Sequence, residues 1–359
     1  MAKILYGVSG EGSGHSSRAK LIAKHLINTG HEVKIVSYDR GYRNLCDTFD
    51  TTEIVGLSIA SRDNKVSILK TFSENISKIP EGTKALKTLR KLFADFKPDC
   101  VFTDFEPSTA YLANHYGIPL ISIDNQHRMR YMNYERPKML KKDALMTETI
   151  IRAMVPKPWY ALITSFHFGK LKNKRCSVFP PLLRPAVLEH KPSKKDHILV
   201  YTTYGFESLL SKLKKFPREN FLIYGAKKGE LKTKNLHFKE FSEEGFLTDL
   251  ASCKAVIASA GFTLISESLY FKKPYLAFPT IGQFEQQLNA YILDKQGYGR
   301  ECLKPSIDAI AAFLYQLNDF DITLSDYEGF GNNLMTQKID DLLANNMALL
   351  KTYKRKKLI

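Results

Sequence analysis

The sequence predicts an α/β protein made of two doubly wound parallel-sheet domains that face each other across a cleft. Short apolar runs alternate with helical segments along most of the chain, a pattern typical of parallel sheets covered by helices. The alternation is interrupted by a proline- and charge-rich stretch over residues 181–196 and then resumes. The length of 359 residues also suits two domains better than one.

The first series, over residues 1–180, opens with the strand candidate KILYGV, a glycine-rich turn and a helical stretch. Apolar residues in SSRAKLIAKHLINTG recur at helical spacing, and Gly30 suits the end of that helix. HEVKIVSY then alternates as a strand. A helix over TKALKTLRKLFADF, a strand over KPDCVFTDF, a helix over STAYLANHYG and a strand over IPLISID continue the pattern, with weaker order over residues 125–159.

The second series, over residues 197–330, contains the strand candidates HILVYTTYG, FLIYGA, LHFKEF, AVIASAG and PYLAFPT. Residues 331–359 predict a long amphipathic helix that packs back on the first domain and ends in a basic tail. Ligands of open parallel sheets bind at the carboxyl ends of the strands. We therefore expect the site in the cleft between the two domains.

Composition limits the classes of protein and partner. Hydrophobic residues make up 44% and charged residues 25% of the chain, which is typical of a soluble globular protein. The five cysteines are scattered without a CxxC pair, and this spacing argues against a disulfide framework or a zinc site. The start of the chain has no apolar stretch typical of a signal peptide, and no apolar run suits a membrane span, so we expect a cytoplasmic protein. The net charge of +16 predicts an anionic partner.

The glycine-rich turn GVSGEGSGHSSRAK allows three interpretations. A nucleoside triphosphate loop would need a lysine after the glycines, and none follows. A dinucleotide loop would use Gly10 and Gly12, with Asp39 as the ribose-binding acid, but its third glycine position holds His15. A nicotinamide oxidoreductase therefore remains only as a weakened alternative.

The third interpretation explains the histidine. A turn of Gly12, Ser13 and Gly14 leaves backbone N–H groups free at a helix start and presents His15 to the cleft. Imidazole can take a proton from a hydroxyl near neutral pH, so His15 is a candidate general base. The alternative is that His15 only caps the helix.

At this point the sequence resembles the GT-B-fold glycosyltransferases, nearest to the MurG-like enzymes of glycosyltransferase family 28 and the UDP-glycosyltransferases. GEGSGH followed by a helix resembles their first loop. ASAGFTLISESLYFKKPYLAFPTIGQFEQQLNA resembles their nucleotide-sugar signature, and LISIDNQH resembles a stretch of the MurG acceptor domain. The resemblance implies a GT-B fold and transfer of a hexose or N-acetylhexosamine from a UDP-sugar, with no further cofactor.

The second-domain signature predicts a donor site on physical grounds as well. A strand ending at Ser259 precedes a helix start at which the amides of Gly261, Phe262 and Thr263 would face an anion. Glu267 lies about one turn further on, where its carboxylate could accept both ribose hydroxyls, and the resemblance implies that role. The alternative is a solvated helix glutamate.

Further donor contacts follow from the same comparison. The resemblance implies sugar contacts from Gln286 and Gln287, whose amides suit hydroxyl groups; an ordinary polar helix start is the alternative. The turn after the first strand of the second domain would supply a second phosphate contact, and an aromatic ring would pack on the base. The residues concerned are Thr203, Tyr204 and Gly205 in the turn, and Phe241 or Phe246 for the ring.

Sugar transfer needs a base for the acceptor and stabilisation of the departing diphosphate. Asp104 ends a first-domain strand, where the resemblance implies an aspartate that orients the base histidine. Glu106 is the alternative candidate, either to orient the histidine or to act as the base itself. We expect displacement with inversion and without metal, because helix amides can stabilise the diphosphate. The D-x-D pattern at Asp319–Asp321 is expected to be a surface loop rather than a metal site.

The acceptor is less defined. Asp124, Asn125, Gln126 and His127 are the acceptor-side candidates by resemblance. The following stretch, RMRYMNYERPKMLKK, mixes basic and aromatic residues, which suits an anionic membrane surface and a lipid-linked or cell-envelope acceptor. A solvated loop is the alternative, and no nucleic acid is expected as a partner.

Other function classes remain open at this stage. A UDP-sugar epimerase of the same fold would bind the donor without an acceptor. A non-enzymatic basic protein would bind nucleic acid or a membrane surface in a salt-dependent way.

Overall fold

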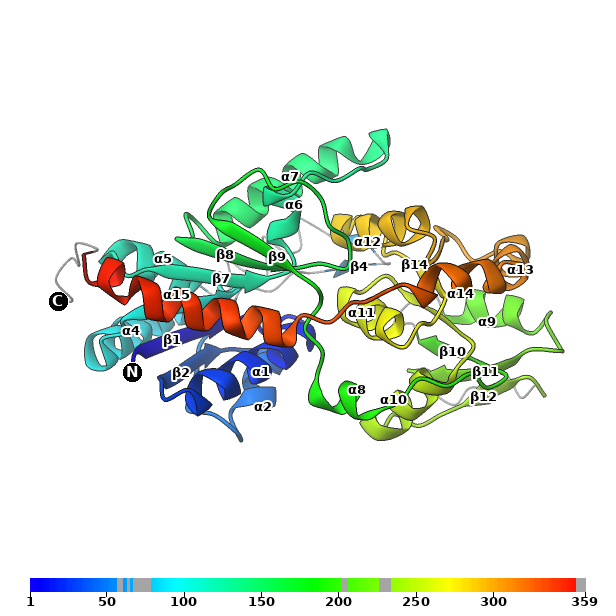
Figure 1. Cartoon of the computed structure of the whole chain (residues 1–359), viewed down its shortest axis with the longest axis horizontal. Coiled ribbons are helices and arrows are strands. Elements are labelled where there is room, and N and C mark those ends of the chain that lie inside the picture. The colour runs from blue at the N-terminus through cyan, green and yellow to red at the C-terminus, as the bar shows by residue number, and fades with distance from the viewer. Residues whose placement is uncertain (57–60, 63–64, 67–78, 202–205, 226–233, 353–359) are drawn as a thin grey trace.

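The computed structural model describes the whole chain except residues 57–60, 63–64, 67–78, 202–205, 226–233 and 353–359, and it has two α/β domains side by side (Figure 1). The first contains a parallel sheet of order β3-β2-β1-β6-β7-β8-β9. Its strands are β1 (Lys3–Val8), β2 (Glu32–Ser37), β3 (Thr51–Glu53), β6 (Cys100–Asp104), β7 (Leu120–Asp124), β8 (Tyr160–Thr164) and β9 (Cys176–Phe179). A separate antiparallel pair joins β4 (Ser61–Arg62) and β5 (Lys65–Val66).

The second domain has a parallel sheet of order β12-β11-β10-β13-β14-β15. Its strands are β10 (His197–Tyr201), β11 (Asn220–Tyr224), β12 (Leu236–Phe238), β13 (Ala255–Ser259), β14 (Tyr275–Phe278) and β15 (Gly299–Glu301). The central strands are apolar along their length because helices cover both faces of each sheet. The predicted fold class of two doubly wound parallel-sheet domains is confirmed.

Helices connect the strands in both domains. In the first domain they are α1 (Gly14–Asn28), α2 (Asp39–Leu45), α4 (Ile79–Phe96), α5 (Pro107–Tyr116), α6 (His127–Tyr131), a 3₁₀ turn η1 (Lys138–Leu140) and α7 (Lys141–Met154). In the second they are α9 (Phe206–Leu213), α10 (Glu243–Ser252), α11 (Phe262–Tyr270), α12 (Phe284–Lys295), α13 (Ile307–Tyr315) and α14 (Leu317–Ser325). None of the helices in the described part of the chain has the length and apolar character needed to cross a bilayer.

The chain crosses between the domains twice (Figure 1). The first crossing runs past β9 and contains the short helix α8 (Pro185–Glu189) inside the stretch expected to be a linker. After the second crossing, α15 (Asn332–Thr352) packs on the first domain, where Met335 and Ile339 join the core that surrounds β1 and α1. His25 on α1 also bonds Asp340 through Nε2 at 2.8 Å.

Two segments differ from the sequence expectation. Residues 125–159 form α6, η1 and α7 rather than a weakly ordered region. Asp319–Asp321 lies on α14 rather than in a loop, because Phe320 and Leu324 from the same face of that helix pack into the core. Asp321 pairs with Lys194.

Candidate active site

The glycine-rich turn of the first domain connects β1 to α1. Gly12 has a φ of +75°, which a residue with a side chain rarely adopts. Ser13 is the N-cap residue of α1, and its side chain makes no capping hydrogen bond. The first amide groups of α1 therefore have no capping partner in the Ser13 side chain, and an anion contact at this turn stays a prediction.

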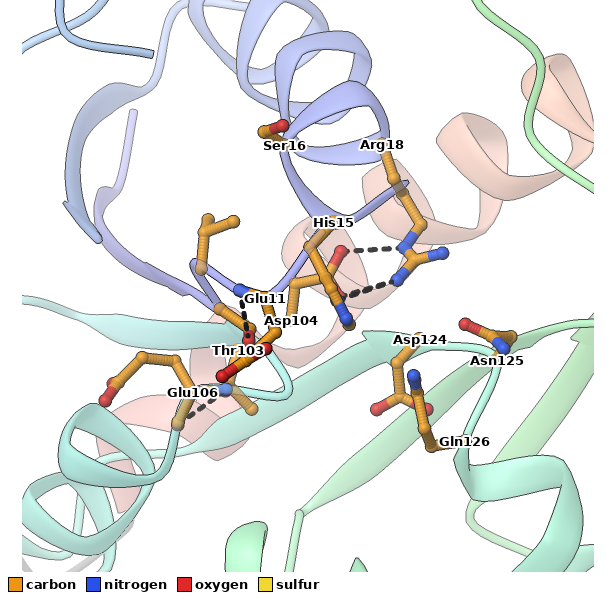
Figure 2. A network of polar contacts seen from close by, with 12 residues as sticks. Glu11, His15, Ser16, Arg18, Thr103, Asp104, Glu106, Asp124, Asn125 and Gln126 are labelled. Atoms are coloured by element: carbon orange, nitrogen blue, oxygen red, sulfur yellow. Dashed lines mark hydrogen bonds and ion pairs between the residues drawn. The ribbon is translucent and has the colours of Figure 1, made fainter. Parts of the chain in front are cut away.

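His15 lies in the first turn of α1 and points toward the end of β6 (Figure 2). Its Nδ1 atom lies 2.6 Å from Oδ1 of Asp104. A carboxylate can only accept, so Nδ1 carries the proton and Nε2 keeps its lone pair in the neutral ring. The imidazole therefore bonds an aspartate rather than capping the helix.

Asp104 is fully buried and is held from a second side by Arg18 (Figure 2). Arg18 donates from Nε to Oδ2 at 2.7 Å and from Nη2 to Oδ1 at 2.6 Å. Burial alone would lower the pKa of the Arg18 guanidinium, but the Asp104 carboxylate outweighs it and raises that pKa above its ordinary value. The two hydrogen bonds from Arg18 thus fix the orientation of the Asp104 carboxylate that bonds His15.

Backbone geometry beside Asp104 is unusual. Phe105 has a φ of +58°, which is costly for a residue with a bulky side chain. Its ring stacks on the His15 imidazole, with centroids 6.5 Å apart and an interplanar angle of 16°. The strained residue therefore supports one face of the candidate base.

Glu106 does not contact this pair in the described structure. Its carboxylate is buried and accepts hydrogen bonds from the amides of Ser108 and Thr109 at 2.8 and 2.7 Å, which caps α5. Burial raises the pKa of Glu106. In Figure 2 it lies apart from the His15–Asp104 pair. Its observed contacts are those of a helix cap, and a catalytic role stays a prediction.

The second domain meets this turn through α11. Gly261 is the N-cap residue of α11, and Thr263 in its first turn approaches Gly14. Ser259 ends β13, where its carbonyl accepts from the Tyr275 hydroxyl at 2.6 Å. A pocket lies between the domains here, lined by Gly14, Ser17, Arg18, Leu21, Leu182, Leu183, Arg184, Phe262, Thr263, Ser266 and Glu267.

Glu267 reaches this pocket from α11 but is almost completely buried. Arg184, from the stretch between the domains, donates to its Oε1 from Nε at 2.8 Å and to its Oε2 from Nη2 at 3.1 Å. Burial raises the pKa of Glu267, and the guanidinium of Arg184 offsets part of that rise. A ribose would therefore meet a carboxylate that already has a cationic partner.

The other donor candidates separate into groups. Gln286 Oε1 accepts from the Thr280 amide at 3.0 Å, whereas Gln287 Oε1 is buried and has no hydrogen-bond partner in the described part of the chain. The side chain of Phe241 is 64% exposed, whereas Phe246 is 5% exposed and belongs to the core. Thr203, Tyr204 and Gly205 lie outside the described residues.

The acceptor-side candidates contact the second domain or one another. Asn125 and Gln126 donate to the two carboxylate oxygens of Glu285 on α12, at 2.7 and 3.4 Å. Asp124 accepts from the Nδ1 and amide of His127 at 2.7 and 2.8 Å, and both side chains are fully buried. Burial opposes ionisation of Asp124, but His127 outweighs it and lowers the pKa of that carboxyl.

The basic and aromatic stretch that follows is not one surface patch. Arg128, Met129, Tyr131 and Met132 are buried. Arg136 is exposed before η1, but most of the exposed basic and apolar residues lie on η1 and α7. They form what we term the α7 surface: Lys138, Met139, Lys141, Lys142, Leu145, Met146 and Ile150.

The sequence did not predict the contacts of three arginines in this region. Arg18 follows His15 by three residues, a spacing that places both on one helix face and could have revealed it. Arg184 lies in the stretch expected to be a linker, and Arg128 in the stretch expected to be a surface. Neither position carries a local sequence signal of its contacts.

Comparison with known proteins identifies the family. The family model described as glycosyl transferase family 1 matches residues 2–318. An uncharacterised glycosyltransferase of Methanosarcina acetivorans is 29% identical over 328 residues, 83% of this chain and 85% of that protein. One of Methanosarcina mazei is 29% identical over 331 residues, with the same coverage of both chains.

Solved structures support the fold. The calicheamicin glycosyltransferase CalG4 matches with a TM-score of 0.66 at 13% identity, over 96% of this chain and 98% of that one. The spinosyn rhamnosyltransferase SpnG complexed with thymidine diphosphate matches with a TM-score of 0.65 at 12% identity, over 95% and 100%. This chain therefore belongs to glycosyl transferase family 1 and is a glycosyltransferase with the GT-B fold.

Proposed function

We propose that this enzyme transfers a hexose or N-acetylhexosamine from a UDP-sugar to a hydroxyl group, with inversion at the anomeric carbon and without a metal ion. One observation carries the proposal: the Asp104-bonded imidazole of His15 stands at the cleft opposite the N-terminus of α11. A base and an anion-binding helix start are the two groups that such a transfer needs.

The chemistry is a single displacement. The acceptor hydroxyl gives its proton to Nε2 of His15 as its oxygen forms a bond to the anomeric carbon. The bond from that carbon to the diphosphate oxygen breaks, and the nucleoside diphosphate leaves with the electron pair. Asp104 holds the proton on Nδ1 and stabilises the imidazolium that forms. One displacement without a covalent intermediate inverts the anomeric carbon.

The second domain would hold the donor. The amides at the start of α11 and its dipole would stabilise the diphosphate in place of a metal. Glu267 would accept the ribose hydroxyls, Gln287 would bind a sugar hydroxyl, and the exposed ring of Phe241 would pack on the base. The complex of SpnG with thymidine diphosphate supports a nucleoside diphosphate site in this fold.

For the acceptor we propose a lipid-linked or cell-envelope glycan, reached by peripheral contact with the cytoplasmic face of a membrane. The α7 surface supports this proposal. Met139 is 81% and Leu145 68% exposed, and Lys138, Lys141 and Lys142 lie among them. Exposed apolar side chains with neighbouring lysines suit the interface of an anionic bilayer.

The test is the anomeric configuration of the product. The enzyme is incubated with α-linked UDP-sugars, and with TDP- and GDP-sugars for comparison, together with an alkyl glycoside acceptor. Proton NMR is expected to show a β-linked product. An α-linked product would overturn inversion, and conversion of the UDP-sugar to an epimer without an acceptor would establish the epimerase alternative.

A further inference from the structure

Arg128 is the largest completely buried side chain in the described part of the chain. It lies on α6, directly after β7 of the first domain. Arginine is almost never fully buried unless it is paired, because moving a cation out of water is costly. Apolar packing alone does not explain why this cation is buried, so its polar contacts are of interest.

One side of the guanidinium is tied to the second domain. Nη2 donates to Oδ1 of Asn289 on α12. The Nδ2 of Asn289 in turn donates to the carbonyl of Ala260 at 2.9 Å. Ala260 directly precedes Gly261, the N-cap of α11. A single amide side chain thus links Arg128 to the turn from which α11 starts.

Aromatic rings flank the guanidinium. Its central carbon lies 5.7 Å from the ring centroid of Phe166 and 5.6 Å from that of Phe262. Those rings stack on each other at 5.8 Å. Phe262 is the first residue of α11, so these contacts also place the cation beside the helix start.

Among the residues that the structure describes, the rest of the guanidinium has no hydrogen-bond partner. Its Nε and Nη1 atoms are buried and unbonded. Glu285 acts on Arg128 only electrostatically, and its oxygens accept from Asn125 and Gln126. Burial lowers the pKa of Arg128, yet an arginine stays charged in proteins. Two N–H donors of a buried cation are therefore available to an oxyanion.

The start of α11 beside Arg128 has no side-chain cap. Gly261 makes no side-chain capping bond, and a Cβ atom on it would meet nothing within 4 Å. The first amides of a helix have no intrahelical partner and favour negative charge. A buried cation of the first domain and a helix start of the second domain, both of which favour negative charge, are thus joined through Asn289 and Phe262.

We propose that Arg128 binds the diphosphate of the donor from the domain opposite α11. This inference rests on the proposed nucleotide-sugar donor. The planar fork of Nε–H and Nη1–H suits two oxygens of a phosphate group. Because Arg128 belongs to the first domain and α11 to the second, the diphosphate would join the two domains.

The test is calorimetric titration of the full chain with UDP and with uridine. Arg128→Gln removes the charge but keeps an amide donor for Asn289. We expect UDP to bind about 10- to 100-fold more weakly to it, with uridine affinity unchanged. Arg128→Lys restores part of the loss, and Arg175→Gln, which removes an exposed arginine elsewhere on the first domain, has no effect.

A second variant tests the same contact in case Arg128→Gln does not fold. Asn289→Asp places a carboxylate against Nη2 of Arg128. We expect this variant to bind UDP more weakly than wild type and to bind uridine with unchanged affinity. If UDP binds Arg128→Gln as tightly as wild type while it binds Glu267→Ala measurably more weakly, this inference alone is overturned. Equal weakening of UDP and uridine also overturns it. A wild-type protein that binds no nucleoside diphosphate overturns the proposed function with it.

Discussion

A Cβ atom placed on Gly14 would lie 2.7 Å from Oγ1 of Thr263. The first residue of α1 and the first turn of α11 therefore approach each other across the two domains, and a side chain on Gly14 would require the Thr263 hydroxyl to move. Glycine at this position permits the close approach of the two helix starts without displacing Thr263.

This contact predicts a coupled effect of two substitutions. Gly14→Ala should lower kcat/KM about tenfold. The added methyl group displaces Thr263 and increases the distance between the N-termini of α1 and α11. Thr263→Ala removes the hydroxyl that the methyl group meets, so the double variant should recover most of the loss. A double-mutant cycle on kcat/KM measures the coupling. Strictly additive effects would contradict the contact.

The two neighbouring glutamines should behave differently. Gln287→Leu removes the buried amide oxygen that has no protein partner, so it should weaken the UDP-sugar about tenfold and leave UDP unchanged. Gln286→Leu instead leaves the Thr280 amide unpaired and should lower the unfolding free energy by about 1–3 kcal/mol. Calorimetry and thermal unfolding check the pair. Equal weakening of UDP and UDP-sugar by Gln287→Leu would exclude the sugar contact.

The Arg184–Glu267 pair predicts a pH effect on UDP binding. Burial raises the pKa of Glu267, and Arg184 offsets part of the rise, so Arg184→Met should raise that pKa further. The carboxyl is ionised above its pKa and protonated below it, and ribose hydroxyls need the ionised form. UDP affinity of Arg184→Met should therefore fall more steeply than that of wild type as the pH is lowered from about 8 to about 6.

A control variant isolates the carboxyl. Adding Glu267→Ala to Arg184→Met should remove the extra pH dependence, because no titrating group remains at that position. Titrations at a series of pH values measure both slopes. A slope for Arg184→Met no steeper than that of wild type would show that Arg184 does not set the charge of Glu267.

The α7 surface predicts binding to anionic lipid. Wild type should sediment with phosphatidylglycerol vesicles, more weakly in high salt, and hardly with phosphatidylcholine vesicles. Leu145→Glu with Ile150→Glu should reduce binding about tenfold without changing transfer to a water-soluble acceptor. Wild-type protein that does not sediment with either vesicle would refute the membrane contact.

Much of the fold could be predicted because buried parallel strands are apolar along their whole length. β1 and β13 are visible for that reason in the sequence alone. β9 and α6 span only 4 and 5 residues, which is too short for a periodic signal. The D-x-D pattern in α14 suggests a loop, whereas the helical spacing of Phe320 and Leu324 indicates the helix that the structure shows.

The site could be predicted where local rules act. The family resemblance implied the pairing of His15 with Asp104, and it agrees with the rule that parallel strands present their carboxyl ends at one edge, because β1 and β6 are neighbours. The contacts of Arg128 could not be predicted. Its partner Asn289 lies 161 residues away in the other domain, and only the packing of two domains buries a side chain that composition alone assigns to the surface.

The most direct test of the account compares donor binding with turnover in His15→Gln. The account predicts that this variant binds UDP-sugar with wild-type affinity while kcat falls about 10²- to 10⁴-fold, because the acceptor loses its base and the donor site is intact. Single-turnover transfer and calorimetry on the same preparation measure the two quantities. A kcat within a few-fold of wild type would contradict the assignment of His15 as the base.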